Sequence, residues 1–199
     1  MIDWLLSLSV GLAYTVFFAI VFAESGLFVG FFLPGDSLLV TLGLVASQGY
    51  LSYPMLLFLG IVAAISGDSV GYVFGRRVGP MIFTKERRFL NKEHLLKAQV
   101  FYEKHGVKTI ILARFVPFAR TFAPILAGVS GMKYKQFITY NVIGGVGWVT
   151  SILSIGYFLG KSVPNIDKYI LLVVGVIVVV SVIPAVVSVL RERQKSTAK

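Results

Sequence analysis

The chain has 199 residues, of which 56% are hydrophobic and only 14% charged, and its mean hydropathy is +0.83. These values exclude an ordinary soluble domain and indicate a single integral membrane domain, residues 1–199, while the absence of cysteine excludes disulfides and thiol chemistry. The net charge of +10 comes mainly from one loop and the tail, so it favours contact with anionic lipid and argues against nucleic-acid binding.

Six apolar segments are long enough to cross a bilayer, which takes about 20 helical residues. They are residues 4–23, 26–46, 53–75, 107–131, 136–160 and 168–190. No basic residue precedes the first segment and no cleavage pattern follows it, so we interpret it as a retained helix rather than a signal peptide. The sequence therefore predicts an all-α integral membrane protein.

Two of these segments contain residues that interrupt helices. The breaks fall at Pro34 and Gly35 in segment 26–46, and at Arg114, Pro117, Arg120 and Pro124 in segment 107–131. Proline removes a backbone donor and disfavours helical geometry at the residue before it. We expect both segments to be re-entrant hairpins, each consisting of two short helices that enter and leave on the same side of the membrane.

The distribution of Lys and Arg supports the second hairpin. Residues 76–108 hold nine of them, and others follow at Lys133, Lys135 and in the basic tail 191–199. All of these residues lie on the cytoplasmic side only if segment 107–131 turns back. The sequence thus predicts a multi-pass protein of the cytoplasmic (inner) membrane with a cytoplasmic C-terminus. No such test exists for the first hairpin, which we expect to enter from outside.

The polar stretch 84–106 separates the two halves of the chain. Its apolar residues and its basic residues alternate in the way that is typical of an amphipathic helix on a membrane surface, here the cytoplasmic one. A solvated connector is the alternative. His94 and His105 lie in this stretch, and we interpret them as solvated or helix-end residues.

An internal repeat relates the two halves at an offset of 85 residues. Glycines coincide at Gly43 and Gly128, Gly60 and Gly145, Gly71 and Gly156, and Gly75 and Gly160. Repeat A covers about residues 15–79 and repeat B about residues 107–164, and the predicted topology runs them in opposite directions. Inverted repeats with broken helices are typical of secondary transporters. Chance coincidence is the alternative in a chain with 20 glycines.

Ionisable residues lie inside the apolar segments at five positions: Glu24, Asp36, Asp68, Arg114 and Arg120. A charge at membrane depth costs roughly 2.5–3.5 kcal/mol, so it persists where it has a partner or faces a wet cavity. The acids belong to the first half of the chain and the arginines to the second. The sequence therefore predicts a polar site that the two halves assemble together.

Arg114 and Arg120 are the candidate substrate-binding residues, because the planar guanidinium group matches a phosphate with two parallel hydrogen bonds. The guest would be a lipid phosphate or pyrophosphate. Glu24 and Asp36 are the candidates for proton coupling, since a carboxylate beside an arginine can take up a proton when its partner moves. The alternative is that these four residues only form static ion pairs. Asp68 is expected to support the residues of the site without contacting the substrate itself.

No enzymatic motif, metal-ligand pair or phosphate loop occurs in the sequence. We therefore expect no enzyme, no metal and no cofactor. An intramembrane hydrolase that uses Asp36 and Asp68 is the less favoured alternative. The sequence leaves open whether the chain acts alone or as a homo-oligomer.

Four motifs in this order resemble the DedA family of membrane proteins. They are Phe22-Ala-Glu24, Phe32-Leu-Pro34-Gly35-Asp36, Gly67-Asp68-x-x-Gly71-Tyr72-x-x-Gly75 and Arg114-Phe-x-Pro117-x-x-Arg120. The similarity covers about residues 15–165. By motif, the acids on which the family depends correspond to Glu24 and Asp36, and its arginines to Arg114 and Arg120. Asp36 is often glutamate in the family, which conserves the charge.

The resemblance implies lipid transport. Bacterial members are regarded as flippases that return undecaprenyl phosphate across the cytoplasmic membrane, some are linked to phosphatidylethanolamine or to the proton motive force, and eukaryotic relatives are lipid scramblases. Our first hypothesis is a proton-coupled carrier of an anionic lipid. The alternatives are an energy-independent phospholipid scramblase, a phosphatidylethanolamine flippase, and a structural membrane protein in which only charge pairing matters.

Overall fold

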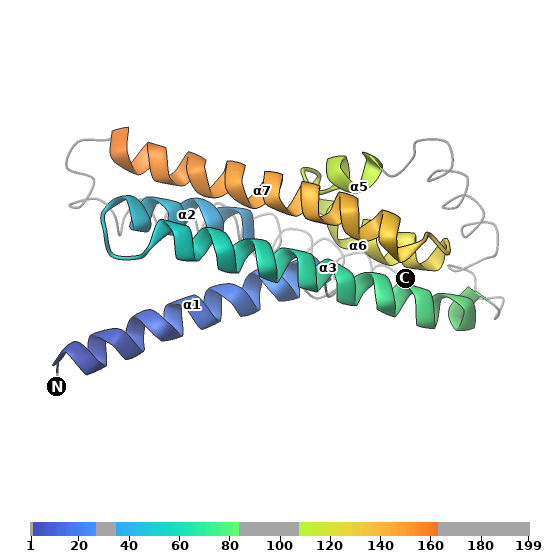
Figure 1. Ribbon diagram of the computed structural model, residues 1–199, viewed down its shortest axis with the longest axis horizontal. Helices are drawn as coiled ribbons and strands as arrows, with labels where there is room; N and C mark the ends of the chain where they lie inside the picture. The colour runs from blue at the N-terminus through green and yellow to red at the C-terminus, as the bar shows by residue number, and fades with distance from the viewer. Residues whose placement is uncertain (1, 27–34, 84–107, 163–199) are drawn as a thin grey trace, which may run out of the picture. The chain divides into compact units, whose positions relative to one another are not determined.

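The computed structural model describes residues 2–26, 35–83 and 108–162, and every regular element in these ranges is an α-helix (Figure 1). The helices are α1 (Ile2–Gly26), α2 (Gly35–Ser47), α3 (Tyr53–Phe83), α5 (Lys108–Ala113), α6 (Pro117–Val129) and α7 (Tyr134–Ser162). The predicted all-α class is confirmed. The connector 84–106, the helix 168–190, the tail 191–199 and Pro34 lie outside the described residues.

Among the residues that the structure describes, two helices are long and apolar enough to cross a membrane. These spans are Tyr53–Val78 in α3, with 26 residues, and Tyr134–Ser162 in α7, with 29 residues. At about 1.5 Å per residue, each exceeds the ~30 Å thickness of the hydrocarbon layer. Both helices continue past the predicted segments 53–75 and 136–160, α3 to Phe83 and α7 to Ser162.

Large apolar side chains lie on the surface of these helices. Phe58 on α3 is 62% exposed, Leu112 on α5 is 69% exposed and Phe158 on α7 is 63% exposed. Single exposed apolar residues are common in soluble proteins, but this many large ones indicate a partner of equal apolarity. The surface is therefore suited to contact with lipid.

Segment 107–131 contains two short helices with a break between them. α5 ends at Ala113 and α6 begins at Pro117, which occupies a first-turn position where its missing N–H costs nothing. Val116 is extended, with φ −115° and ψ 115°, as the residue before a proline prefers. Arg120 and Pro124, which the sequence also placed among the breaks, lie within α6 instead. The break is thus confined to residues 114–116.

The chain divides into two compact units. The first comprises Met1–Phe31 and Leu57–Thr150, and the second comprises Phe32–Leu56 and Ser151–Lys199. The first unit contains α1, α5 and α6, the second contains α2, and the two long helices α3 and α7 contribute residues to both.

The first unit packs α6 directly onto α3 through glycine. A Cβ atom on Gly128 would collide with the carbonyl oxygen of Tyr72, and one on Gly75 would collide with the carbonyl oxygen of Ile125. The adjoining core contains Tyr72, Ile110, Ala127 and Phe137. Backbones that touch in this way need small residues, which is the usual packing of membrane helices.

The second unit packs α2 onto α7 in the same manner. A Cβ on Gly43 would collide with the carbonyl oxygen of Leu153, and one on Gly156 would collide with the carbonyl oxygen of Val40. Gly43 and Gly128 are partners in the predicted repeat. In each unit, therefore, the short helix comes from one half of the chain and the long helix residues beneath it come from the other half.

Candidate functional site

Arg114 follows α5 directly and begins the break between α5 and α6. Its amide donates to Ile111, and the amides of Phe115 and Val116 donate to Leu112 and Ala113, so the last turn of α5 closes with tight backbone bonds. The guanidinium group then points into the first unit, where the side chain is only 4% exposed. A charge buried to this extent requires partners of opposite charge or strong acceptors.

Two acceptors from different helices meet the Arg114 guanidinium. Its Nη2 donates to Oδ2 of Asp68 on α3 and to Oδ1 of Asn141 on α7. Asn141 also donates from Nδ2 to the carbonyl oxygen of Ile65, at 3.1 Å, which holds the amide in the orientation that Arg114 needs. Asp68 is itself 3% exposed and Asn141 is fully buried. The three side chains tie α3, α7 and the α5–α6 break together.

Two glycines of α7, Gly144 and Gly145, lie against the Arg114 side chain. A Cβ on Gly144 would lie 3.0 Å from Cδ of Arg114, and a Cβ on Gly145 would lie 3.5 Å from its Cζ. The first distance is tighter than ordinary van der Waals contact, so Gly144 gives the arginine stem the room it occupies. Asp68, Asn141 and the two glycines therefore pack closely around the Arg114 side chain.

Arg120 forms a second buried ion pair. It lies in the first half of α6, and its Nη2 donates to Oε1 of Glu24 near the end of α1. Its guanidinium carbon lies 5.1 Å from the centroid of the Trp148 ring on α7, within the range of a cation–π contact. The side chain of Glu24 is 1% exposed and that of Arg120 is 11% exposed.

Only one carboxylate oxygen of Glu24, Oε1, accepts a hydrogen bond from the described residues. Within residues 2–26, 35–83 and 108–162, its second oxygen, Oε2, is buried and has no hydrogen-bond partner. A buried carboxylate oxygen without a donor is costly unless a proton, a water molecule or a ligand satisfies it. Oε2 of Glu24 can therefore accept one more hydrogen bond or bind a proton.

The two arginines contact the same face of α7. Asn141, Gly145 and Trp148 are spaced by four and three residues, which places them on one side of a helix. Asn141 and Trp148 are roughly 10 Å apart along the axis, or two helical turns. The first unit therefore presents two arginine–carboxylate pairs along one stripe of α7.

The remaining predicted site residues belong to the second unit or mark helix starts. Gly35 is the first residue of α2 and is buried, and Asp36 lies in its first turn, where a negative charge is favoured by the helix dipole. Pro117 is the first residue of α6. The described residues therefore bring Glu24 to Arg120 and Asp68 to Arg114, while Asp36 is positioned by α2.

Asn141 and Trp148 are site residues that sequence reasoning missed. The signal for Asn141 was present, because an amide within an apolar segment must find a partner just as a charge must. Trp148 gave no comparable signal, since a tryptophan in a membrane helix is common. No group of three His, Cys, Asp or Glu side chains suited to a metal ion occurs among the residues that the structure describes.

Residues 33–158 match the VTT domain. Over an alignment of 208 residues, the chain is 44% identical to Protein DedA of Escherichia coli (strain K12), with 98% of this chain and 94% of that protein covered. The chain belongs to the DedA family. This assignment agrees with the four sequence motifs, and the similarity extends over nearly the whole chain.

Other relatives agree with this assignment. The chain is 45% identical to the uncharacterized membrane protein Rv0364 of Mycobacterium tuberculosis (strain H37Rv) over 175 residues, covering 86% of this chain and 76% of that protein. It is 37% identical to the inner membrane protein YqjA of E. coli (strain K12) over 161 residues, covering 80% of this chain and 73% of that protein. No solved structure matches. This DedA-family chain is a membrane protein, and its described ranges fold into helices.

Proposed function

We propose that this DedA-family protein moves an anionic lipid, most favourably undecaprenyl phosphate, across the cytoplasmic membrane, with Arg120 as the group that receives the headgroup phosphate. The observation that carries this proposal is the Arg120–Glu24 pair, in which the guanidinium donates to one carboxylate oxygen while the other oxygen has no hydrogen-bond partner among the described residues. A phosphate offers the same acceptor geometry as the carboxylate it would replace.

Glu24 supplies the coupling in this scheme. When a proton binds Oε2, the carboxyl group becomes neutral and its attraction for Arg120 falls, so the guanidinium becomes available to the lipid phosphate. When the lipid leaves, loss of the proton restores the ion pair. One proton taken up and released for each lipid is therefore the simplest cycle. Asp36 stays in the proposal as a second acid that can carry a proton.

Arg114 has a different role in this proposal from the one that the sequence suggested. It already donates to Asp68 and Asn141 and lies against Gly144 and Gly145, so a headgroup could reach it only by breaking a buried network. Breaking such a pair costs roughly 3–5 kcal/mol. Arg114 and Asp68 would therefore hold the α5–α6 segment in place while Arg120 exchanges partners.

The proposed topology is an inverted repeat with two re-entrant hairpins and a cytoplasmic C-terminus. It is supported by the helix break at residues 114–116 and by the glycine contacts that recur between α6 and α3 and between α2 and α7. A polar headgroup that follows irregular backbone avoids direct contact with hydrocarbon. Cysteine accessibility at Lys133 and in the tail tests the sidedness of this scheme.

A liposome assay tests the proposed function. The protein is reconstituted with a fluorescent polyprenyl phosphate, and a membrane-impermeant quencher reports how fast the headgroup reaches the outer leaflet. We expect Arg120→Gln to slow exposure about 10-fold or more, because one charge-assisted contact with phosphate is lost. Lys135→Gln, an exposed charge on α7, is the matched control and should leave the rate unchanged. Normal transport by Arg120→Gln would refute the role of Arg120.

Two further measurements distinguish the alternatives. A pH gradient across the liposome changes the rate and the final distribution if a proton is coupled, and changes neither if the protein is an energy-independent scramblase or an uncoupled phosphatidylethanolamine flippase. The double substitution E24R/R120E keeps the pair but exchanges its ends. Restored transport by this double variant would show that pairing alone matters, as expected of a structural protein.

A further inference from the structure

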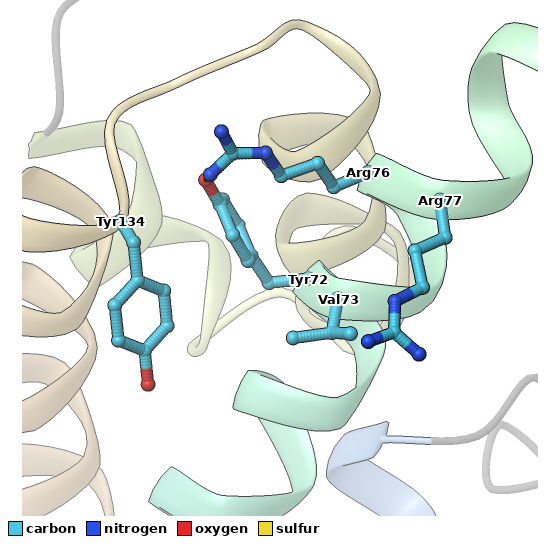
Figure 2. Close-up of a pocket in the computed structure, with 5 residues that line it drawn as sticks. All are labelled: Tyr72, Val73, Arg76, Arg77 and Tyr134. Atoms are coloured by element: carbon cyan, nitrogen blue, oxygen red, sulfur yellow. The ribbon is translucent and has the colours of Figure 1, made fainter.

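A pocket of about 460 Å³ lies where α3 faces the beginning of α7, and none of its residues belongs to the site described above. Its walls are formed by Tyr72, Val73, Arg76 and Arg77 from α3 and by Tyr134 from α7 (Figure 2). The volume falls within the range of about 300–1,000 Å³ that is usual for small-molecule sites. The pocket is therefore large enough for a lipid headgroup.

Tyr72 gives this pocket a fixed wall. It is 1% exposed, its ring stacks on Phe137 with a centroid separation of 4.5 Å, and its hydroxyl donates to the carbonyl oxygen of Met132. Nη1 of Arg76 donates to the same hydroxyl at 3.4 Å, which positions the guanidinium at one edge. Tyr134, 42% exposed, faces Tyr72 at a ring-centroid separation of 5.4 Å.

The two arginines present their charges to different sides of the pocket. Figure 2 shows the Arg76 guanidinium beside the Tyr72 hydroxyl and the Arg77 guanidinium on the other side of Val73. Both side chains are exposed, and neither is paired with a carboxylate among residues 2–26, 35–83 and 108–162. Two adjacent cations without an acid attract a dianion or a phosphate ester.

An apolar stripe leads along α3 to this pocket. Val70, Val73 and Phe74 are 44%, 41% and 45% exposed, and together with Arg77 they follow the i, i+3, i+4, i+7 spacing of one helix face. A hydrocarbon chain lying on this stripe would end at the guanidinium groups. The combination of an apolar track and a cationic end suits an amphiphile better than a soluble anion.

We propose that this pocket binds a phosphate-bearing membrane lipid, with the phosphate contacting Arg76 and Arg77 and the hydrocarbon chain lying along Val70, Val73 and Phe74. Basic pockets at the ends of membrane helices hold anionic headgroups in this way, and tyrosine is favoured at the same depth. The site is separate from the Arg120–Glu24 pair. It binds lipid whether or not the protein transports lipid.

Native mass spectrometry of the detergent-solubilised full chain tests this assignment, with phosphatidic acid as the probe. We expect the double variant R76Q/R77Q to bind phosphatidic acid about 10-fold more weakly than the wild type, because charge-assisted contacts to the phosphate are lost. K133Q/K135Q is the matched control. It removes two exposed positive charges on either side of Tyr134 without removing a residue of the pocket wall.

Equal weakening in both double variants, or none in R76Q/R77Q, would overturn the assignment. Val73→Glu provides a second variant that keeps both arginines but places a carboxylate between them, and it too should lose the lipid. Inorganic phosphate is the competing ligand. If inorganic phosphate binds the wild type as tightly as phosphatidic acid does, the hydrocarbon chain contributes nothing, the pocket binds a free anion and the lipid assignment is wrong.

Discussion

The two buried arginines of the first unit differ in how completely they are enclosed. Arg114 donates to both a carboxylate and an amide and has glycine beneath its stem, whereas Arg120 pairs with Glu24 and lies over the face of Trp148. Their positions in an apolar segment alone predict the same role for both arginines. The comparison teaches that two arginines buried in the same unit can differ in the groups that enclose them, a rigid amide and glycines at Arg114 and an aromatic ring at Arg120.

The largest expected effect distinguishes the two arginines by stability. Arg114→Ala should lower the free energy of unfolding in mixed micelles by roughly 3–5 kcal/mol, because it leaves the Asp68 carboxylate buried without its cation. Arg120→Ala also leaves a buried carboxylate, that of Glu24, without its cation, and it should cost somewhat less because the Arg120 side chain is 11% exposed against 4% for Arg114. Denaturant titrations of both variants measure the difference. Equal losses would remove the distinction between a fixed and an exchangeable pair.

An intermediate effect is expected at Asn141, which bridges Arg114 and the backbone of α3. Asn141→Ala should lower the free energy of unfolding by about 1–3 kcal/mol, because the Arg114 guanidinium and the Ile65 carbonyl each lose a buried partner. Thr139→Ala, at an exposed residue of the same helix whose hydroxyl donates to the Lys135 carbonyl one turn earlier, serves as the comparison for a polar-to-alanine change. Transport that falls only in proportion to the folded fraction would agree with a positioning role for Asn141.

The smallest effect on stability, but a large one on transport, is expected for Glu24→Gln. Glutamine retains the carbonyl oxygen that accepts from Arg120 and loses the charge, so the free energy of unfolding should change by about 1 kcal/mol. The rate of headgroup exposure should fall and lose its response to a pH gradient, because the group that takes up the proton is gone. If Glu24→Gln keeps the full response to the pH gradient, Glu24 is not the coupling residue and another acid takes up the proton.

The sequence supplied the helical class and the ionisable residues but could not assign their partners. Proline predicted a break within segment 107–131, and the cost of charge in hydrocarbon singled out five residues, which are Glu24, Asp36, Asp68, Arg114 and Arg120. Partner choice depends on which helix faces touch, and a periodic pattern contains no such information. Asp68 was expected to stand behind the site, yet it is a direct partner of Arg114.

Helix ends were harder to predict than helix positions. α3 continues from Tyr53 to Phe83, eight residues past the end of the predicted segment 53–75, and Gly75, where that segment ends, is covered by Ile125 of α6. Conversely, Pro124 lies inside α6 without ending it. Tertiary contact decides such cases, since a neighbouring helix compensates for the weak propensity of glycine.

Because each short helix packs on a long helix from the other half, the contacts constrain when the helices can pack during synthesis. The residues of α2 that surround Gly43 pack on Leu153 and Gly156, which the ribosome makes more than 100 residues later, and α3 has to wait for the α6 residues near Gly128. Neither compact unit is complete until the second half has been inserted. A nascent chain stalled in the connector would have Gly43 and Gly75 without the helices that cover them in the finished fold.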